Sequence, residues 1–260
     1  MNSLIVATIV ALTNEFGTVS VDTCGAHVLS YVPAGGREVL FRSSEECWTN
    51  SWHHGGIPLC WPWFGRNGDP GSEMHGFVRL LDWEVVSRTD SPRESRLHLR
   101  LGSGEESAKW LDGSFVLDYE IVLSEHLKLD LKMRNTGPRR FAVTTGFHPY
   151  FSIKDMLNAT VRTPRGDIRC VPGMDGGRPF ADGRYVLDDG TREITLSTWG
   201  NNKLVIWNQG EEPLGGLAPE DWRHFVCVEP AILPRMEGIW LDPEMTYEIG
   251  MSIQQTKERE

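Results

Sequence analysis

Cysteine is scarce in this sequence, and basic residues are outnumbered by acidic ones. The five cysteines lie far apart and form no C-x-x-C pair, which favours reduced thiols over a disulfide framework or a zinc knuckle. There are 26 Lys and Arg against 36 Asp and Glu, and the net charge of −10 argues against nucleic acid as a partner. A small anionic substrate needs only a local positive pocket, so the charge does not exclude one.

The sequence also lacks a long hydrophobic run. The stretch LIVATIVAL near the N-terminus is far too short to span a membrane. It has neither the basic leading segment nor the small-residue cleavage site of a signal peptide. We therefore expect a first β-strand there, no membrane partner and a cytoplasmic location.

Several motifs with known chemistry are absent. There is no G-x-G-x-x-G, P-loop or G-x-S-x-G pattern, which counts against dinucleotide binding, nucleotide hydrolysis and the α/β-hydrolase fold. H-x-H and H-E-x-x-H spacings are missing too, and the adjacent His53 and His54 would point opposite ways on a strand. We expect no metal and no other cofactor, and a metal-dependent β-sandwich enzyme is a minor alternative.

Alternation of apolar and polar residues dominates the chain. In LKLDLKMRN, Leu127, Leu129, Leu131 and Met133 alternate with charged residues, and the NTGP that overlaps its end marks a turn. LHLRL, FVLDYEIVL, REITLSTW, KLVIWNQ, FVCVEP and TYEIGMSI show similar short runs. Because no helical stripe exceeds about two turns, the pattern predicts an all-β fold, an antiparallel sandwich or barrel, as one domain over residues 1–260.

The segment from about Trp48 to Trp83 does not alternate. It is rich in Gly, Pro and aromatic residues, and its tryptophans include Trp52, Trp61 and Trp63. A long stretch of this kind inside a compact β protein is usually a functional loop.

Two residues outside this loop suit proton transfer. Glu229 ends the apolar run FVCV directly before a proline, so we expect a low-dielectric position that raises its pKa toward that of a general base. A glutamate that faces solvent or pairs with an Arg is the equally weighted alternative. His148 lies among aromatic residues in GFHPYF, where it is either a core histidine or, with its ordinary pKa of about 6.5, a proton donor.

Three further residues give weaker signals. His75 and Arg79 lie four residues apart in MHGFVR, where the Arg would serve a surface ion pair as readily as an anion. Asp182 stands in the loop FADGRYVLDDG, in which aspartates are also ordinary turn residues.

Five motifs occur together and in order: GGIPLCWPWFG, HGFVR followed by Trp83, GFHPYF, VIWNQG and CVEP. In this order they resemble those of the hexose-6-phosphate mutarotases, or glucose-6-phosphate 1-epimerases, of the aldose 1-epimerase family. The resemblance runs from about Leu12 to Ile253 and includes the first strands of that family. It implies a large antiparallel β-sandwich of the galactose mutarotase-like kind, and a cofactor-free isomerase that interconverts α and β anomers of a sugar.

The resemblance also implies roles for individual residues. His148 would be the general acid and Glu229 the general base, placed on opposite sides of the sugar ring. A tryptophan of the loop would stack on the sugar's C–H face. The residues expected to contact the substrate are His54, His75, Arg79, Asp182 and Trp63.

One position departs from the family pattern. Where the hexose-6-phosphate enzymes carry Arg before GGIP, this chain has His54. Arg is permanently charged, whereas a free histidine is only about a quarter protonated near pH 7. The loss of one charged contact would weaken phosphate binding by roughly 1.5–3 kcal/mol, which Arg79 and Arg66 are placed to offset.

The expected partner is therefore a small-molecule sugar or sugar phosphate, with D-glucose 6-phosphate the first choice. An aldose 1-epimerase of unphosphorylated sugars and a non-catalytic carbohydrate-binding or sensing protein are the alternatives. If His54 binds phosphate as an imidazolium, the KM for the phosphorylated sugar should rise with pH.

Overall fold

The computed structural model describes residues 8–44, 54–69, 71–178, 183–233 and 238–258. Among them the helical elements are α1 (Glu105–Ala108) and the 3-10 turns η2 (Val78–Leu80), η3 (Met156–Asn158) and η4 (Asp221–His224). None of the described helices is long and apolar enough to cross a membrane. Strands provide nearly all of the regular structure, which confirms the all-β prediction.

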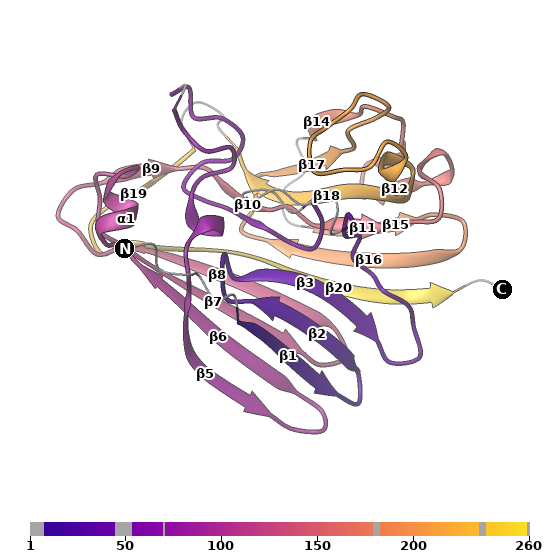
Figure 1. Ribbon diagram of the computed structural model, residues 1–260, viewed down its shortest axis with the longest axis horizontal. Coiled ribbons are helices and arrows are strands. Elements are labelled where there is room, and N and C mark those ends of the chain that lie inside the picture. Colours follow the sequence, from indigo (N-terminus) through magenta and orange to yellow (C-terminus); the bar gives the residue numbers. More distant parts are fainter. Residues whose placement is uncertain (1–7, 45–53, 70, 179–182, 234–237, 259–260) are drawn as a thin grey trace.

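The largest sheet has nine antiparallel strands among the described residues (Figure 1). Their order is β13 (Gly166–Arg169), β12 (Thr160–Thr163), β15 (Gly183–Asp188), β16 (Arg192–Trp199), β20 (Thr246–Glu258), β8 (Leu127–Asn135), β7 (Phe115–Leu123), β6 (Ser95–Gly102) and β5 (Glu84–Asp90). In β6 every second residue is buried, as the alternation in the sequence predicts.

Two smaller sheets pack on this one (Figure 1). One consists of β1 (Ile9–Asn14), β2 (Gly17–Asp22) and β3 (His27–Pro33). The other has the order β14 (Asp175–Arg178), β17 (Lys203–Trp207), β18 (Phe225–Ile232), β10 (Thr145–Phe147) and β4 (Leu59–Cys60), with β11 (Tyr150–Ser152) also paired to β18. A ribbon of β9 (Phe141–Val143) and β19 (Ile239–Leu241) completes the set. One buried apolar core joins the layers into a β-sandwich.

Strand β8 shows how a polar residue is accommodated on the outer face of the large sheet. Its apolar residues are fully buried, each contributing about 1.5–3 kcal/mol. Asp130 on the opposite face, which alternation alone would leave in water, is only 6% exposed. It accepts a hydrogen bond from Nε1 of Trp199 at 3.0 Å, and the indole lies on Gly250, where a Cβ would come within 2.3 Å of the ring. Glycine is therefore required at position 250.

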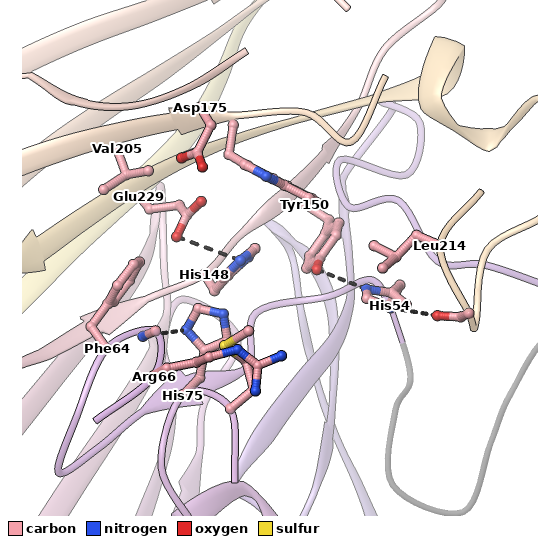
Figure 2. A pocket seen from close by; sticks show the side chains of 14 residues that line it. His54, Phe64, Arg66, His75, His148, Tyr150, Asp175, Val205, Leu214 and Glu229 are labelled. Atoms are coloured by element: carbon pink, nitrogen blue, oxygen red, sulfur yellow. Dashed lines mark hydrogen bonds and ion pairs between the residues drawn. The ribbon is translucent and has the colours of Figure 1, made fainter. Parts of the chain in front are cut away.

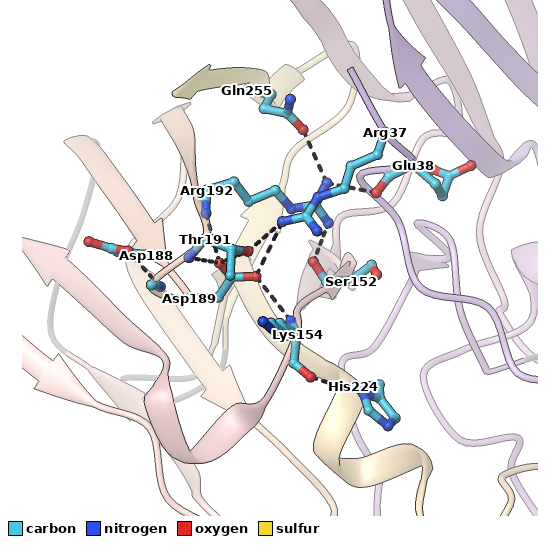
Figure 3. Close-up of polar contacts among 11 residues, drawn as sticks. Arg37, Glu38, Ser152, Lys154, Asp188, Asp189, Thr191, Arg192, His224 and Gln255 are labelled. Atoms are coloured by element: carbon cyan, nitrogen blue, oxygen red, sulfur yellow. Dashed lines mark hydrogen bonds and ion pairs between the residues drawn. The ribbon is translucent and has the colours of Figure 1, made fainter. Parts of the chain in front are cut away.

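A buried polar cluster anchors the end of β11 (Figure 3). The guanidinium of Arg192 is 2% exposed and donates to the carbonyls of Glu38 and Ser152 and to the side chain of Gln255. Asp189 accepts hydrogen bonds from the backbone N–H groups of Thr191 and Arg192 in its own turn and from that of Lys154, which follows β11. Because Ser152 lies on β11, this cluster fixes the strand that reaches the cleft described next.

Candidate active site

Strand β18, whose eight residues are all buried, forms the floor of the cleft. β10 and β11 pair with one edge of β18 in a single continuous register, with Gly146 opposite Ala231 and Tyr150 opposite Cys227. The register places His148, between β10 and β11, opposite Glu229. The two residues are cross-strand partners, so their side chains point to the same face of the sheet.

Two prolines interrupt the ladder at this point. Pro149 and Pro230 have no N–H to donate, and the pairing of β18 with its neighbour is open between β10 and β11. The sequence predicted that the strand ends at Glu229, but β18 continues to Ile232, with Pro230 opposite Leu204 of β17. A proline is tolerated inside the strand because the ladder is already open there.

The GGIPLC motif lies against the other edge of the FHPYF motif. The backbone N–H of His148 donates to the carbonyl of Pro58 at 3.0 Å, and that of Tyr150 to the carbonyl of Gly56 at 2.9 Å. Gly56 has a φ of +64°, and a Cβ there would come within 2.3 Å of the Val28 carbonyl oxygen. The two motifs are therefore adjacent in the structure, and GGIPLC helps to position His148 and Tyr150 at the site.

A cavity of about 500 Å³ opens over this face (Figure 2). The loop that the sequence marks as irregular supplies a large part of its wall. The rest comes from β11, β14, β17 and β18, from His148 between β10 and β11, and from Leu214 and Gly215 in the loop after β17. The lining residues are His54, Phe64, Gly65, Arg66, Met74, His75, His148, Tyr150, Asp175, Val205, Trp207, Leu214, Gly215 and Glu229.

His148 and Glu229 form a buried pair on the cavity floor. Nε2 of His148 lies 3.6 Å from Oε2 of Glu229, and the two residues are 7% and 1% exposed. Burial, followed by the charge of Asp175, raises the pKa of Glu229 well above its ordinary value. Burial, followed by the nearby His75, lowers the pKa of His148 well below its ordinary value. Both shifts favour the uncharged forms of the two groups.

His75 is a neutral hydrogen-bond donor at the side of this pair. Burial and the charge of Arg79 lower its pKa to about 4. The backbone N–H of Gly65 donates to its Nδ1 at 3.1 Å, so the ring proton is on Nε2. Its ring meets that of His148 edge-on, with 5.1 Å between centroids. The residue has a φ of +61°, a conformation that non-glycine residues rarely adopt and that is typical of functional positions.

His54 connects the floor of the cleft to the loop at Gly215. Its Nε2 lies 3.0 Å from the carbonyl oxygen of Gly215, which can only accept, so this nitrogen carries a hydrogen. Its Nδ1 lies 3.0 Å from the hydroxyl of Tyr150. Burial raises the pKa of Tyr150 well above its ordinary value, which keeps its hydroxyl protonated. Both ring nitrogens of His54 are therefore engaged within the protein.

The structure brings four of the residues expected to form the site into one cavity and places others elsewhere. Arg79 is not among the lining residues. Its guanidinium pairs with Glu73 at 3.2 Å, and its charge adds to burial in lowering the pKa of His75. Trp63 packs in the core, 8% exposed, with its Nε1 donating to a backbone carbonyl. Asp182 lies outside the described residues, as do Trp52 and His53.

Tyr150, Trp207 and Asp175 are among the lining residues that were not selected from the sequence. Tyr150 stands in the motif FHPYF and Trp207 in the motif VIWNQG. The register puts both beside the acid–base pair, because Tyr150 pairs with Cys227 on one edge of β18 and Trp207 pairs with Cys227 on the other edge. Asp175 pairs with Trp207 one strand further out. Trp207 meets the ring of His148 at 5.8 Å and offers the aromatic wall expected from a loop tryptophan. Strand pairing over long sequence distances, which no local pattern reports, determines these positions.

Comparison with known proteins agrees with this geometry. A Salmonella typhimurium protein provisionally named glucose-6-phosphate 1-epimerase is 29% identical over 228 residues, covering 79% of this chain and 76% of that one. A protein of the same provisional name from Escherichia coli K12 is 28% identical over 232 residues, covering 80% and 77%. The crystal structure of a provisionally assigned mutarotase from Salmonella typhimurium has a TM-score of 0.86 and 23% identity, covering 98% of this chain and 92% of that one.

The fold is therefore a β-sandwich of the mutarotase class, as the resemblance of the motifs implied. The sequence profile of the family described as aldose 1-epimerase matches residues 8–168, and the chain belongs to that family. It is an isomerase that interconverts the α and β anomers of a sugar, and its substrate is a small-molecule sugar.

Proposed function

We propose that this isomerase acts on a hexose 6-phosphate, with D-glucose 6-phosphate the leading substrate, and that Glu229 and His148 are its general base and general acid. The buried pair on the cavity floor supports these roles. Its members lie 3.6 Å apart, and burial raises the pKa of Glu229 and lowers that of His148, as a base and an acid that exchange protons with a substrate require. A volume of about 500 Å³ suits a small ligand such as a hexose.

The side-by-side placement of the pair fits the chemistry of ring opening. One proton must leave the anomeric hydroxyl and another must reach the ring oxygen, and both oxygens are bonded to the same carbon. Two groups on opposite sides of the ring, which we expected from the sequence, are not required. Cross-strand partners that point to one face can reach the two neighbouring oxygens from the same side.

The proton cycle begins from the charged arrangement of the pair, with the proton on His148 and a carboxylate at Glu229, which burial disfavours relative to the uncharged arrangement. Glu229 takes the proton of the anomeric hydroxyl while His148 delivers its proton to the ring oxygen, and the C1–O5 bond breaks. Rotation about C1–C2 turns the other face of the aldehyde to the hydroxyl, and the same steps in reverse close the ring. The open-chain stage coincides with the uncharged pair that burial favours. Each group contributes roughly 10²–10⁴-fold to the rate.

Neutral groups hold the sugar around this pair. The Nε2–H of His75 is placed to donate to a sugar hydroxyl, and Trp207 and Phe64 offer aromatic surfaces to the C–H faces of the ring. Arg66, an exposed residue of the cavity wall, offers the cation for a phosphate. His54 is a weaker phosphate ligand than the sequence suggested, because its two nitrogens already bond to Tyr150 and Gly215.

Parallel assays of α-D-glucose 6-phosphate and α-D-glucose test the substrate. Freshly dissolved sugar is followed by polarimetry or NMR, with the spontaneous rate subtracted. We expect Arg66→Gln to raise the KM for the phosphorylated sugar by about 10-fold, which is the loss of one exposed charged contact, and to leave glucose unaffected. Arg88→Gln, at an exposed position on β5 outside the cavity lining, is the matched control.

Unphosphorylated sugars are the second candidate substrate, because His54 stands where an arginine is expected and both of its ring nitrogens already form hydrogen bonds within the protein. A glucose kcat/KM equal to or above that of glucose 6-phosphate would establish an aldose 1-epimerase of free sugars instead. Sugar binding without any acceleration of anomer exchange would contradict the roles of Glu229 and His148.

A further inference from the structure

The register that pairs His148 with Glu229 brings a third donor to the same place. Cys227 precedes Glu229 by two residues on β18 and therefore points to the same face. One donor atom from each of the three side chains lies within 4.8 Å of the others, and all three residues are buried. In the described part of the chain, no hydrogen-bond partner is present for Nδ1 of His148 or Oε2 of Glu229.

We infer that His148, Cys227 and Glu229 form a binding site for a borderline-soft divalent cation, Zn²⁺ or its analogue Cd²⁺, and that the bound cation inhibits the isomerase. A thiolate, an imidazole and one carboxylate are a donor set that Zn²⁺ takes readily, whereas Mg²⁺ and Ca²⁺ require oxygen ligands. Tetrahedral Zn²⁺ holds such donors roughly 3.4–3.6 Å from one another. The 3.6 Å between His148 and Glu229 already meets this spacing.

The charges at the site balance in the bound state. A thiolate and a carboxylate supply two negative charges against the two positive charges of the cation, so a buried complex carries no net charge. Binding displaces the thiol proton of Cys227 and any proton on His148 or Glu229 to solvent. Three protein ligands leave one coordination position, which the cavity supplies with water.

Inhibition follows from the identity of two of the ligands. The cation takes the lone pairs of the base and the acid proposed above, so cation and sugar exclude each other. The inhibition therefore rests on the proposed function, but the binding of the cation does not. Cys227 has no role in the proposed proton cycle, so replacing it tests cation binding without removing the proposed acid or base.

The experiment measures cation binding and inhibition in the parent and in three variants. Binding is read from the ultraviolet absorption of the Cd²⁺–thiolate bond and from calorimetry with Zn²⁺. Inhibition is read from the mutarotation of α-D-glucose 6-phosphate and of α-D-glucose. The variants are Cys227→Ser, with Cys227→Ala as a second replacement, and Cys170→Ser as the control, because Cys170 is equally buried and lies outside the group.

We expect one Cd²⁺–thiolate site per chain in the parent and in Cys170→Ser. The Cys227 variants should keep their mutarotation rate, lose the absorption band and require about 100-fold more Zn²⁺ for the same inhibition. The Zn²⁺ concentration for half inhibition should rise with sugar concentration, and a chelator should restore the rate.

Binding without inhibition would uphold the site and overturn the proposed roles of His148 and Glu229. An unchanged Cd²⁺–thiolate band in both Cys227 variants, or no band in the parent, would overturn the site. Equal Zn²⁺ sensitivity of parent and Cys227 variants would do the same.

Discussion

Replacement of Glu229 by glutamine should slow the reaction and stabilise the fold in the same protein. The amide keeps the shape of the carboxyl but cannot take a proton from the anomeric hydroxyl. Loss of a general base costs about 10²–10⁴-fold in kcat/KM, or roughly 2.7–5.5 kcal/mol of transition-state stabilisation. The same replacement with His148→Asn should add little, since two groups that share one proton act as a unit.

The gain in stability has a pH dependence whose sign follows from the raised pKa of Glu229. Above the unfolded pKa of about 4.5 the unfolded chain releases this proton, while the folded chain retains it until its own higher pKa. Within that window the parent loses about 1.4 kcal/mol of folding free energy per pH unit from this group. Glu229→Gln avoids that loss, so its advantage over the parent should grow as the pH rises above about 5, until the raised pKa of the folded carboxyl is reached.

Polarimetry and thermal unfolding over this pH range check both effects. Glu220→Gln is the control, because its side chain is 75% exposed and lies outside the cavity lining. Each kcal/mol should appear as a rise in Tm of about 2–4 °C for a chain of this size. A variant with the parental rate would refute the role of the base, and a Tm difference independent of pH would refute the buried protonated carboxyl.

Three further predictions concern the residues around this pair and the polar cluster. The pKa of His75 in the folded protein is about 4, so its ring stays neutral there while the unfolded chain takes up a proton below about pH 6.5. The free energy of unfolding of the parent should therefore fall by up to about 3 kcal/mol as the pH falls from about 6.5 toward 4. Urea unfolding of His75→Asn should not show this decrease. The KM for glucose 6-phosphate should stay constant between roughly pH 6 and 8, because both ring nitrogens of His54 are engaged by Tyr150 and Gly215 and do not bind the phosphate; a KM that rises with pH would assign the phosphate to an imidazolium. Arg192→Met should leave buried carbonyls without donors and cost roughly 3–5 kcal/mol in denaturant unfolding; a loss below about 1 kcal/mol would contradict the anchoring role of that cluster.

Local patterns in the sequence predict the fold class well because alternation is a local property. The apolar face of β8 and the buried residues of β6 follow directly from it. The resemblance of the ordered motifs adds the sandwich type and the family, both of which the comparisons confirm. The single-domain organisation and the catalytic roles of His148 and Glu229 stay predictions.

Long-range pairing limits how much of the site the sequence predicts. The sequence singled out Trp63, but its indole is buried in the core. Trp207, from a distant strand, provides the tryptophan of the cavity wall instead. Glu229 was expected at the end of a strand, and it lies inside one because Pro230 sits where the ladder is open. The hydrogen bonds of His54 depend on a loop more than 150 residues away in the chain, which the residue type alone does not reveal.

Because β10 and β11 pair with β18 in one continuous register, the face on which His148 lies depends on whether the number of residues before it in this segment is odd or even. Insertion of one residue ahead of His148 within this segment would turn it to the opposite face of the sheet, whereas insertion of two would restore the face but change its partner. The order of His148 and Glu229 along the chain does not matter, because backbone pairing between strands brings the two residues together. A chain cut in the exposed turn at Arg165, between β12 and β13, should therefore assemble from its two fragments into an active enzyme, while a single deletion within β10 should abolish activity in a protein that still folds.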